Sequence, residues 1–178
     1  MLVLNQHAKV STLYFSDDGE VPNSHLPVVL YKNAVRASVD SIPKAKEVLA
    51  RWAIGNDWYL DWVDTDAVFR YTHYHSTAHE ILVVLDEMAE IHLGGKQGKT
   101  VSVTHGDMLA IPAGVSHRRT RGNKDFTVAG FYPVGQTWDL LRLGKKEYRA
   151  AKNAIAKVPL PKADPFFGTK GPLMSFWK

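Results

Sequence analysis

Residues 73–80 read His-Tyr-His-Ser-Thr-Ala-His-Glu, and four of these eight side chains can bind a first-row transition metal. His73 and His75 are two residues apart, so on a β-strand both imidazoles point to the same face. Glu80 follows at an odd spacing from His75, which would put it on the opposite face of an uninterrupted strand. Residues 76–79 must therefore contain a turn if Glu80 is to join the two histidines. His79 competes with Glu80 as a ligand, but its strand parity is opposite to that of the histidine pair.

A second stretch, residues 106–117, could supply a further ligand from His117. The chain has no cysteine, which excludes disulfides and thiolate ligands and leaves His, Asp and Glu to hold any metal. Imidazole and carboxylate suit Fe, Mn, Ni, Cu or Zn. Three histidines and one glutamate would leave open positions for water, oxygen or a chelating substrate, which a closed structural site lacks.

One helix and a series of short strands are expected to position these residues. Ser41 is a predicted N-cap, Pro43 fits the first turn, and apolar residues at helical spacing predict a helix over 42–54. Period-two patterns and turn residues then predict short strands at 12–16, 28–31, 58–62, 68–75, 81–85, 89–93, 100–104, 108–111 and 125–132. Residues 81–85 are apolar at every position, which indicates burial on both faces. This pattern favours an antiparallel sandwich or small barrel.

Residues 136–178 differ from the rest of the chain. Their apolar positions from 148 to 158 hint at a short helix, and prolines and glycines after it exclude long regular structure. Phe166, Phe167, Leu173, Phe176 and Trp177 are too apolar for a disordered tail. We expect an ordered tail laid across the barrel or a partner subunit.

The two metal-binding stretches together resemble the cupin motifs. The first motif is His-x-His, a short spacer and Glu, which matches His73, His75 and Glu80. The second is Gly, five residues, Pro-x-Gly, two residues and His, which matches Gly106, Pro112-Ala113-Gly114 and His117. The resemblance implies that His73, His75, Glu80 and His117 converge on one divalent transition metal (Fe, Mn, Ni or Zn) inside the barrel.

The fold implied is all-β: a cupin jelly-roll β-barrel (double-stranded β-helix) with one N-terminal helix and an irregular C-terminal tail. Residues 73–80, Ile111–Val115 and Ile155–Lys162 also resemble the YjlB-like branch of bacterial cupins. Glu87 and Arg121 stand where the cupin motifs often have glycine and asparagine, and neither position is a ligand. We expect one domain over 1–178, with a barrel core at about 58–135, an N-terminal extension and a wrapping tail at about 136–178. The resemblance also implies a homodimer.

Several other side chains are candidates for lining the site. Arg119 and Arg121 share strand parity with His117, so one or both are expected at the barrel mouth, where a guanidinium would bind a substrate carboxylate or phosphate. The alternative is that a turn begins by Arg121 and the arginines face solvent. Tyr71 shares parity with His73 and is a second substrate-binding candidate. The Trp-rich segment 58–62 is interpreted as sheet packing rather than a ligand cage.

Composition limits the partners and the location. The 178 residues are 45% hydrophobic and 22% charged, with a net charge of +4, which is ordinary for a globular chain. Apart from residues 117–121 the basic residues are scattered, which argues against nucleic-acid binding. No apolar run is long enough to span a membrane, residues 1–10 do not look like a secretory signal, and a cytoplasmic location is expected.

The expected function is a metal-dependent enzyme, a dioxygenase or an isomerase, acting on a small polar metabolite. The catalytic residues are not indicated by any spacing. The alternative is a non-catalytic cupin that binds a small ligand, with the metal held in the barrel. Both hypotheses use the same four ligands and differ only in turnover.

Overall fold

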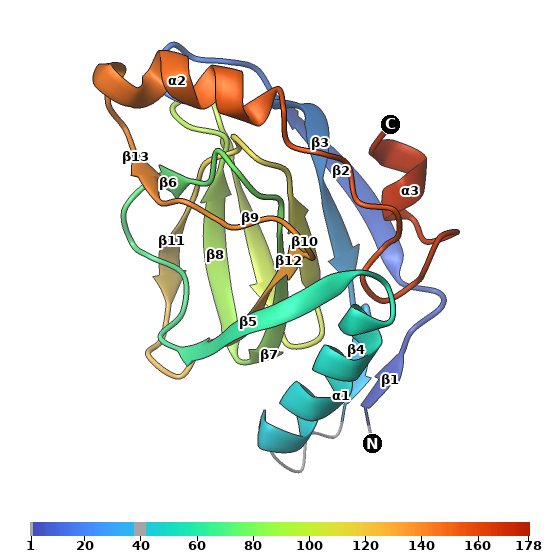
Figure 1. The fold of residues 1–178 in the computed structure, drawn as a ribbon. Helices are drawn as coiled ribbons and strands as arrows, with labels where there is room; N and C mark the ends of the chain where they lie inside the picture. The colour runs from blue at the N-terminus through green and yellow to red at the C-terminus, as the bar shows by residue number, and fades with distance from the viewer. Residues whose placement is uncertain (1, 38–41) are drawn as a thin grey trace.

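The computed structural model describes residues 2–37 and 42–178, so the predicted N-cap Ser41 lies outside the described residues. Its strands and helices are β1 (Leu2–Leu4), β2 (Lys9–Phe15), β3 (Ser24–Lys32), β4 (Val35–Ala37), α1 (Ile42–Ile54), β5 (Trp58–Thr65), β6 (His73–Tyr74), β7 (Glu80–Asp86), β8 (Met88–Leu93), β9 (Lys99–Thr104), β10 (Met108–Ile111), β11 (His117–Gly122), β12 (Thr127–Pro133), β13 (Leu141–Arg142), α2 (Lys145–Ile155) and α3 (Leu173–Phe176). Figure 1 shows α1 at one end of the strands and α2 at the other.

Two antiparallel sheets make up the body of the molecule. One has the strand order β2-β3-β10-β7-β12-β5 and the other has the order β13-β6-β11-β8-β9. Both sheets contribute side chains to one apolar cluster, including Leu82 and Val84 from β7 and Ile91 and Leu93 from β8. A core shared by two sheets in this way lies between them, as in a sandwich. The barrel is not closed, and the arrangement fits the predicted all-β jelly roll.

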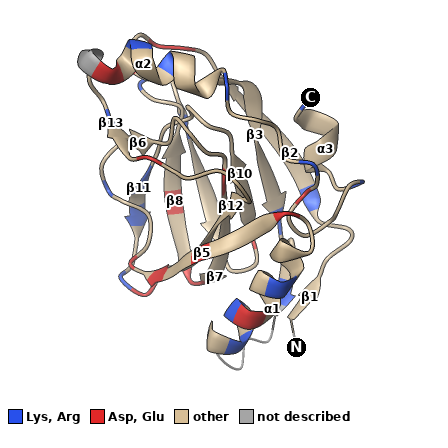
Figure 2. Cartoon of the chain, in the orientation of Figure 1, with Lys and Arg blue, Asp and Glu red and all other residues tan. Residues whose placement is uncertain are grey.

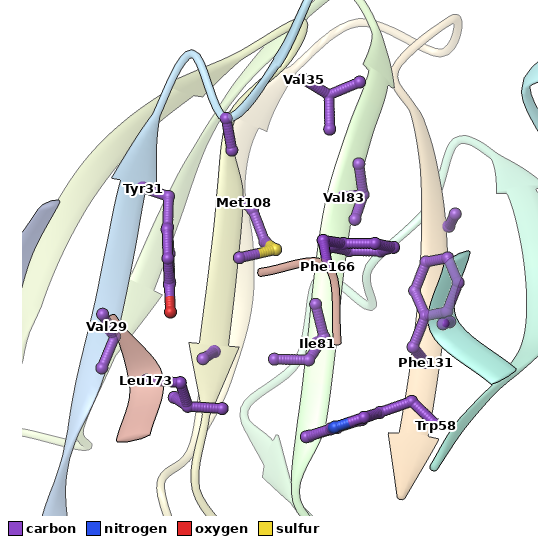
Figure 3. Close-up of a cluster of buried hydrophobic side chains, with 14 of the residues drawn as sticks. Val29, Tyr31, Val35, Trp58, Ile81, Val83, Met108, Phe131, Phe166 and Leu173 are labelled. Atoms are coloured by element: carbon purple, nitrogen blue, oxygen red, sulfur yellow. The ribbon is translucent and has the colours of Figure 1, made fainter. Parts of the chain in front are cut away.

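The six-stranded sheet is buried on its other face as well. Ile81 and Val83 of β7 point into a second apolar cluster, together with Trp58 and residues of α1. Figure 3 shows Phe166 from the tail among the side chains of this face. Successive residues of β7 therefore meet two different cores, which confirms the prediction that 81–85 is buried on both sides.

The tail after residue 136 is ordered, as predicted, and it forms part of the second core. Leu173 and Trp177 are almost fully buried, and the Trp177 indole nitrogen donates to the Pro27 carbonyl oxygen at 2.9 Å. Trp58 donates to the carbonyl oxygen of Ala163 in the same way, also at 2.9 Å. The tail contains α2, where the apolar spacing hinted at a helix, and an irregular segment between α2 and α3.

The predicted helix 42–54 is confirmed as α1 with the same bounds. Each predicted strand overlaps an observed one, except that 68–72 precedes the very short β6 and is not itself a strand. The short strands β1, β4 and β13 were not predicted, since two or three residues are too few to carry a periodic pattern. The strand β11 was not among the predicted strands either, although a shared strand parity was assumed for His117, Arg119 and Arg121. Within the described residues, no helix is both long and apolar enough to cross a membrane.

Candidate metal centre

Strand pairing brings the two motif stretches together. His117 begins β11 and lies opposite His73 of β6 in the strand register. The backbone N–H of Gly114 donates to the His75 carbonyl oxygen at 2.8 Å, which fixes the second turn against the first. Gly114 has φ +94°, and a Cβ there would come within 2.3 Å of the Asn23 carbonyl oxygen, so only glycine fits. The glycine of the second motif is therefore needed to place His117.

The predicted turn between His75 and Glu80 is present. β6 ends at Tyr74, β7 begins at Glu80, and the residues between them lie outside any strand. Leu82 and Val84 belong to the core between the sheets, and Glu80 shares their parity on β7. The turn therefore resets the strand parity, and Glu80 faces the same interior as the histidines.

The three motif histidines meet in this interior, and Glu80 lies beside two of them. His73, His75 and His117 offer ring nitrogens that all lie within 4.8 Å of one another. Glu80 Oε2 is 3.1 Å from His117 Nε2 and 3.6 Å from His75 Nε2. All four residues are at most 6% exposed. The donor set is three imidazoles and one carboxylate, which suits a first-row transition metal.

The outer nitrogen of each imidazole is directed at a backbone carbonyl oxygen. His73 Nδ1 lies 3.1 Å from the Tyr71 oxygen, and His117 Nδ1 lies 3.5 Å from the Val115 oxygen. His75 Nδ1 makes a short contact with the Asp139 oxygen. A carbonyl can only accept, so these contacts favour the proton on Nδ1 and leave the Nε2 lone pair free. This is the tautomer that metal-binding histidines use.

Glu80 is likewise fixed through only one of its two carboxylate oxygens. Its Oε1 accepts a hydrogen bond from the Tyr132 hydroxyl at 2.5 Å. Its Oε2 is buried and has no hydrogen-bond partner among the described residues. Leaving a buried carboxylate oxygen unpaired is unfavourable unless something else satisfies it. The site therefore has a free acceptor oxygen beside two imidazole nitrogens, which is where a cation would be stabilised.

The charges of the site are coupled. Burial alone would raise the pKa of Glu80, but His75 and His117 hold it well below its ordinary value. Burial alone would lower the pKa of His75, but the negative charge of Glu80 raises it. Burial, followed by the charge of His117, lowers the pKa of His73 to about 3. Glu80 is thus an ionised carboxylate that favours a positive charge, from a proton or a metal, among the imidazoles.

A cavity of about 320 Å³ opens onto these side chains. This volume is within the range of small-molecule sites. Its walls come from β5 and the loop after it, from the motif residues and from two later aromatic residues. The lining residues are Asp61, Trp62, Asp64, Asp66, Ala67, Val68, Phe69, His73, His75, Glu80, Leu82, His117, Tyr132 and Trp138.

The other predicted site residues lie outside this cavity. Arg119 is 2% exposed, and its guanidinium pairs with Asp66 rather than entering the cavity. A bulge in β11 between Arg119 and Arg121 breaks their shared parity, and the Arg121 side chain is 81% exposed. Tyr71 lies beside His73, with the guanidinium of Arg142 3.8 Å from its ring centre. Direct substrate binding by Arg119 or Tyr71 stays a prediction.

His79 is buried away from the cavity. Its Nδ1 accepts a hydrogen bond from the backbone N–H of Ala113 at 3.0 Å, and its ring packs against Trp177. Its side chain therefore braces the turn of the second motif against the tail.

Several residues of the site were not predicted from the sequence, among them Tyr132, Trp138, Asp139 and Trp62. Tyr132 binds Glu80, and Trp138 packs on His75 with ring centres 5.3 Å apart. The Asp139 carboxylate accepts from the Ser76 N–H at 2.6 Å and from the Ser76 hydroxyl at 2.5 Å. Trp62 lines the cavity, although the segment 58–62 was interpreted as sheet packing. Trp58 packs in the second core and Trp62 packs against the core between the sheets, so the interpretation holds, and Trp62 has the cavity wall as a further role.

Comparison with known proteins places the chain in a family. No family model matches the sequence. The protein YjlB of Bacillus subtilis, described as uncharacterised, is 35% identical over 170 residues, which cover 95% of this chain and 97% of YjlB.

Similar solved structures are more distant. RmlC from Streptococcus suis, in complex with dTDP-D-xylose, is 7% identical with a TM-score of 0.39, and the match covers 70% of each chain. A variant of oxalate decarboxylase from Bacillus subtilis is 12% identical with a TM-score of 0.38, and the match covers 72% of this chain and 30% of that enzyme. The match thus spans less than a third of that enzyme's length. On the extended match to YjlB and on its own two motifs, the chain belongs to the YjlB-like branch of the cupins.

Proposed function

We propose that His73, His75, Glu80 and His117 hold one divalent transition metal. The observation that supports this most strongly is that all four side chains are fixed through their outer atom. Each imidazole faces a carbonyl through Nδ1, and Glu80 accepts from Tyr132 through Oε1. The atoms left over are three Nε2 and one Oε2, and the four residues that carry them line the cavity.

We propose further that the protein is a metal-dependent enzyme of oxygenase or isomerase type acting on a small polar metabolite. A metal with open positions would supply Lewis-acid activation of a substrate oxygen, or redox chemistry if it is iron or manganese. The chain's own residues orient the substrate and exclude water. Trp138 covers His75, and Trp62 donates to the Tyr132 hydroxyl at 3.1 Å, which holds that hydroxyl against Glu80.

Metal retention by matched variants tests the site. Protein purified without chelator is expected to contain about one transition-metal ion per chain, and His75→Ala and Glu80→Ala are expected to lose it while staying folded. His25→Ala is the control, since His25 is exposed and outside the site. Unchanged metal content in the two site variants would mean that the ligands are wrong.

Turnover separates the enzyme from the alternative, a non-catalytic binder with the same ligands. Iron-loaded protein would be screened for oxygen uptake with catechols, thiols and keto acids, and the manganese and zinc forms for sugar isomerisation. Activity that disappears in Glu80→Ala supports the enzyme. Metal retention without turnover across these panels favours the binder.

A further inference from the structure

The cavity above the metal centre is acidic, although the chain as a whole carries a net charge of +4. Asp61, Asp64 and Asp66 line its outer part, and Glu80 lies at its base. Lysine and arginine are absent from the described lining residues. Figure 2 shows acidic positions at the end of β5 and basic positions on β11, on different elements of the molecule. The acidic lining is therefore local and is not a consequence of composition.

Two of these three aspartates carry charge that no described partner neutralises. The ion pairs found within residues 2–37 and 42–178 reach Asp66 only, through Arg70 and Arg119. Asp61 accepts a neutral hydrogen bond from the Trp138 indole at 2.8 Å. Asp61 and Asp64 therefore keep a net negative potential at the cavity mouth, and salt screens it because both side chains are exposed.

Aromatic faces make up much of the remaining wall. Trp62, Phe69, Tyr132 and Trp138 all line the cavity. The rings of Tyr132 and Trp138 stack with centres 5.9 Å apart and planes 21° apart. Aromatic faces attract cations, and more strongly where water is excluded. The hydrogen bond from Trp138 to Asp61 keeps an aromatic ring and a carboxylate side by side at the entrance.

The guanidinium of the buried Arg119 already binds oxygens of the protein itself. The Arg119 guanidinium donates to the Asn123 carbonyl at 3.0 Å and to the Asp66 carbonyl at 3.1 Å, and it also binds the Asp66 carboxylate. It lies against the Phe126 ring, and neither of these two residues lines the cavity. Arg119 thus orients Asp66, and the cavity offers a carboxylate or phosphate no cationic partner of its own.

We propose that the ligand of this cavity is a small organic cation: a protonated amine that also carries oxygens able to chelate the metal. The inference rests on the proposed metal site, because the chelating end needs a metal at His73, His75, Glu80 and His117. The amine then lies between the carboxylates of Asp61 and Asp64 and the rings of Trp62 and Trp138. An anionic tail of the same size would meet like charges and lose affinity.

Three catechols that share the chelating diol and differ in tail charge test the proposal. Dopamine is cationic, 4-methylcatechol is neutral and 3,4-dihydroxyphenylacetate is anionic. Zinc-loaded protein, dialysed free of excess zinc, would be titrated with each by calorimetry at low salt. Dopamine is expected to bind at least about tenfold more tightly than the anion, with the neutral catechol between them, and added salt should narrow the gap.

Matched variants test whether the preference for a cation comes from the charges at the cavity mouth. Asp64→Asn removes a charge at the cavity mouth and should reduce the ratio of dopamine to anion affinity several-fold, with zinc content unchanged. Glu47→Gln removes the same charge from the exposed side of α1 and should leave the ratio unchanged. A ratio that falls equally in both variants would overturn the proposal, because the preference would then come from total charge.

The outcomes distinguish this inference from the metal site. If the chain binds zinc and then binds all three catechols with equal affinity, the cation preference is overturned and the metal site is still supported. Tighter binding of the anionic catechol would also overturn the cation preference, and it would indicate that an arginine reaches the cavity. A wild-type chain that binds no zinc would overturn the metal site and the cation preference together.

Discussion

Two buried carboxylates on opposite sides of the six-stranded sheet are treated differently. Asp164, fully buried in the tail, accepts from the Tyr31 hydroxyl at 2.6 Å, from the backbone N–H groups of Phe166 and Phe167 at 3.1 Å and from that of Leu173 at 3.2 Å. Glu80, 3% exposed, has one hydrogen-bonded oxygen and one unpaired. A saturated carboxylate organises the chain around it, whereas a half-satisfied one can still bind a cation.

The two carboxylates also share one feature, a buried tyrosine partner. In each case, a buried tyrosine donates to the carboxylate, and burial together with the carboxylate charge raises the pKa of both Tyr31 and Tyr132. Both phenols therefore stay protonated and act as donors. The difference lies in the other oxygen, which meets the backbone of the tail in Asp164 and the imidazoles in Glu80.

Removing the saturated carboxylate should have the largest effect on folding. Asp164→Ala leaves the Tyr31 hydroxyl and three N–H groups without their acceptor, and it should lower the free energy of unfolding by about 3 kcal/mol or more. Urea unfolding measures this, and the metal content of the folded fraction should not change. A loss below about 1 kcal/mol would mean that Asp164 does not anchor the tail.

Removing the charge of the half-satisfied carboxylate should mainly affect the metal. Glu80→Gln keeps an acceptor for Tyr132 but lacks the anionic oxygen, so metal affinity should fall by roughly 100-fold or more. The metal-free protein should lose less unfolding free energy than Asp164→Ala does, because no hydrogen bond to Oε2 is lost and only the charge interaction with His75 and His117 disappears. Competition with a chelator gives the affinity. A strongly destabilised metal-free variant would show that Glu80 is structural, like Asp164.

The two tyrosines offer a matched and smaller contrast. Tyr31→Phe should lower the free energy of unfolding by about 1–2 kcal/mol with normal metal affinity. Tyr132→Phe should lower metal affinity about 10-fold, since it frees the carboxylate that Tyr132 orients. Both variants would be compared by urea unfolding and chelator competition. If both variants changed stability and metal affinity to the same extent, the proposed difference between Asp164 and Glu80 would be contradicted.

An exposed carboxylate should have the smallest effect. Burial would raise the pKa of Asp17, but Lys152, Tyr148 and the Gly19 N–H lower it to about 2, below the ordinary 3.8. A depressed carboxyl pKa stabilises the fold above pH 3.8, and this contribution is lost as pH falls from 3.8 towards 2. Because the pair with Lys152 is partly exposed, the contribution should be under about 1 kcal/mol. Asp17→Asn should flatten the pH dependence of unfolding in that window and nowhere else.

Local sequence patterns, together with the resemblance to the cupin motifs, were enough to select the four candidate ligands. The spacing of His73 and His75, the need for a turn before Glu80 and the glycine turn before His117 are properties of a few neighbouring residues. Each depends on strand parity or turn geometry, and both are set locally. The helix 42–54 was predicted for the same reason.

The residues that complete the site depend on pairings across the chain. Tyr132 reaches Glu80 because Phe131 of β12 pairs with Ile81 of β7, which puts the next residues side by side. Asp139 and Trp138 reach His75 only through the path of the chain after β12. Asp164 follows Ala163 and precedes Pro165 like any loop residue, and its burial depends on where the tail packs. No local period encodes these contacts.

An anomalous-difference map from crystals of the zinc-loaded protein, collected at the zinc edge, tests the metal centre most directly. We expect one strong peak at roughly 2.0–2.2 Å from the Nε2 atoms of His73, His75 and His117 and from Glu80 Oε2. A peak bound elsewhere, or no peak in this site at full zinc loading, would contradict the proposed metal centre.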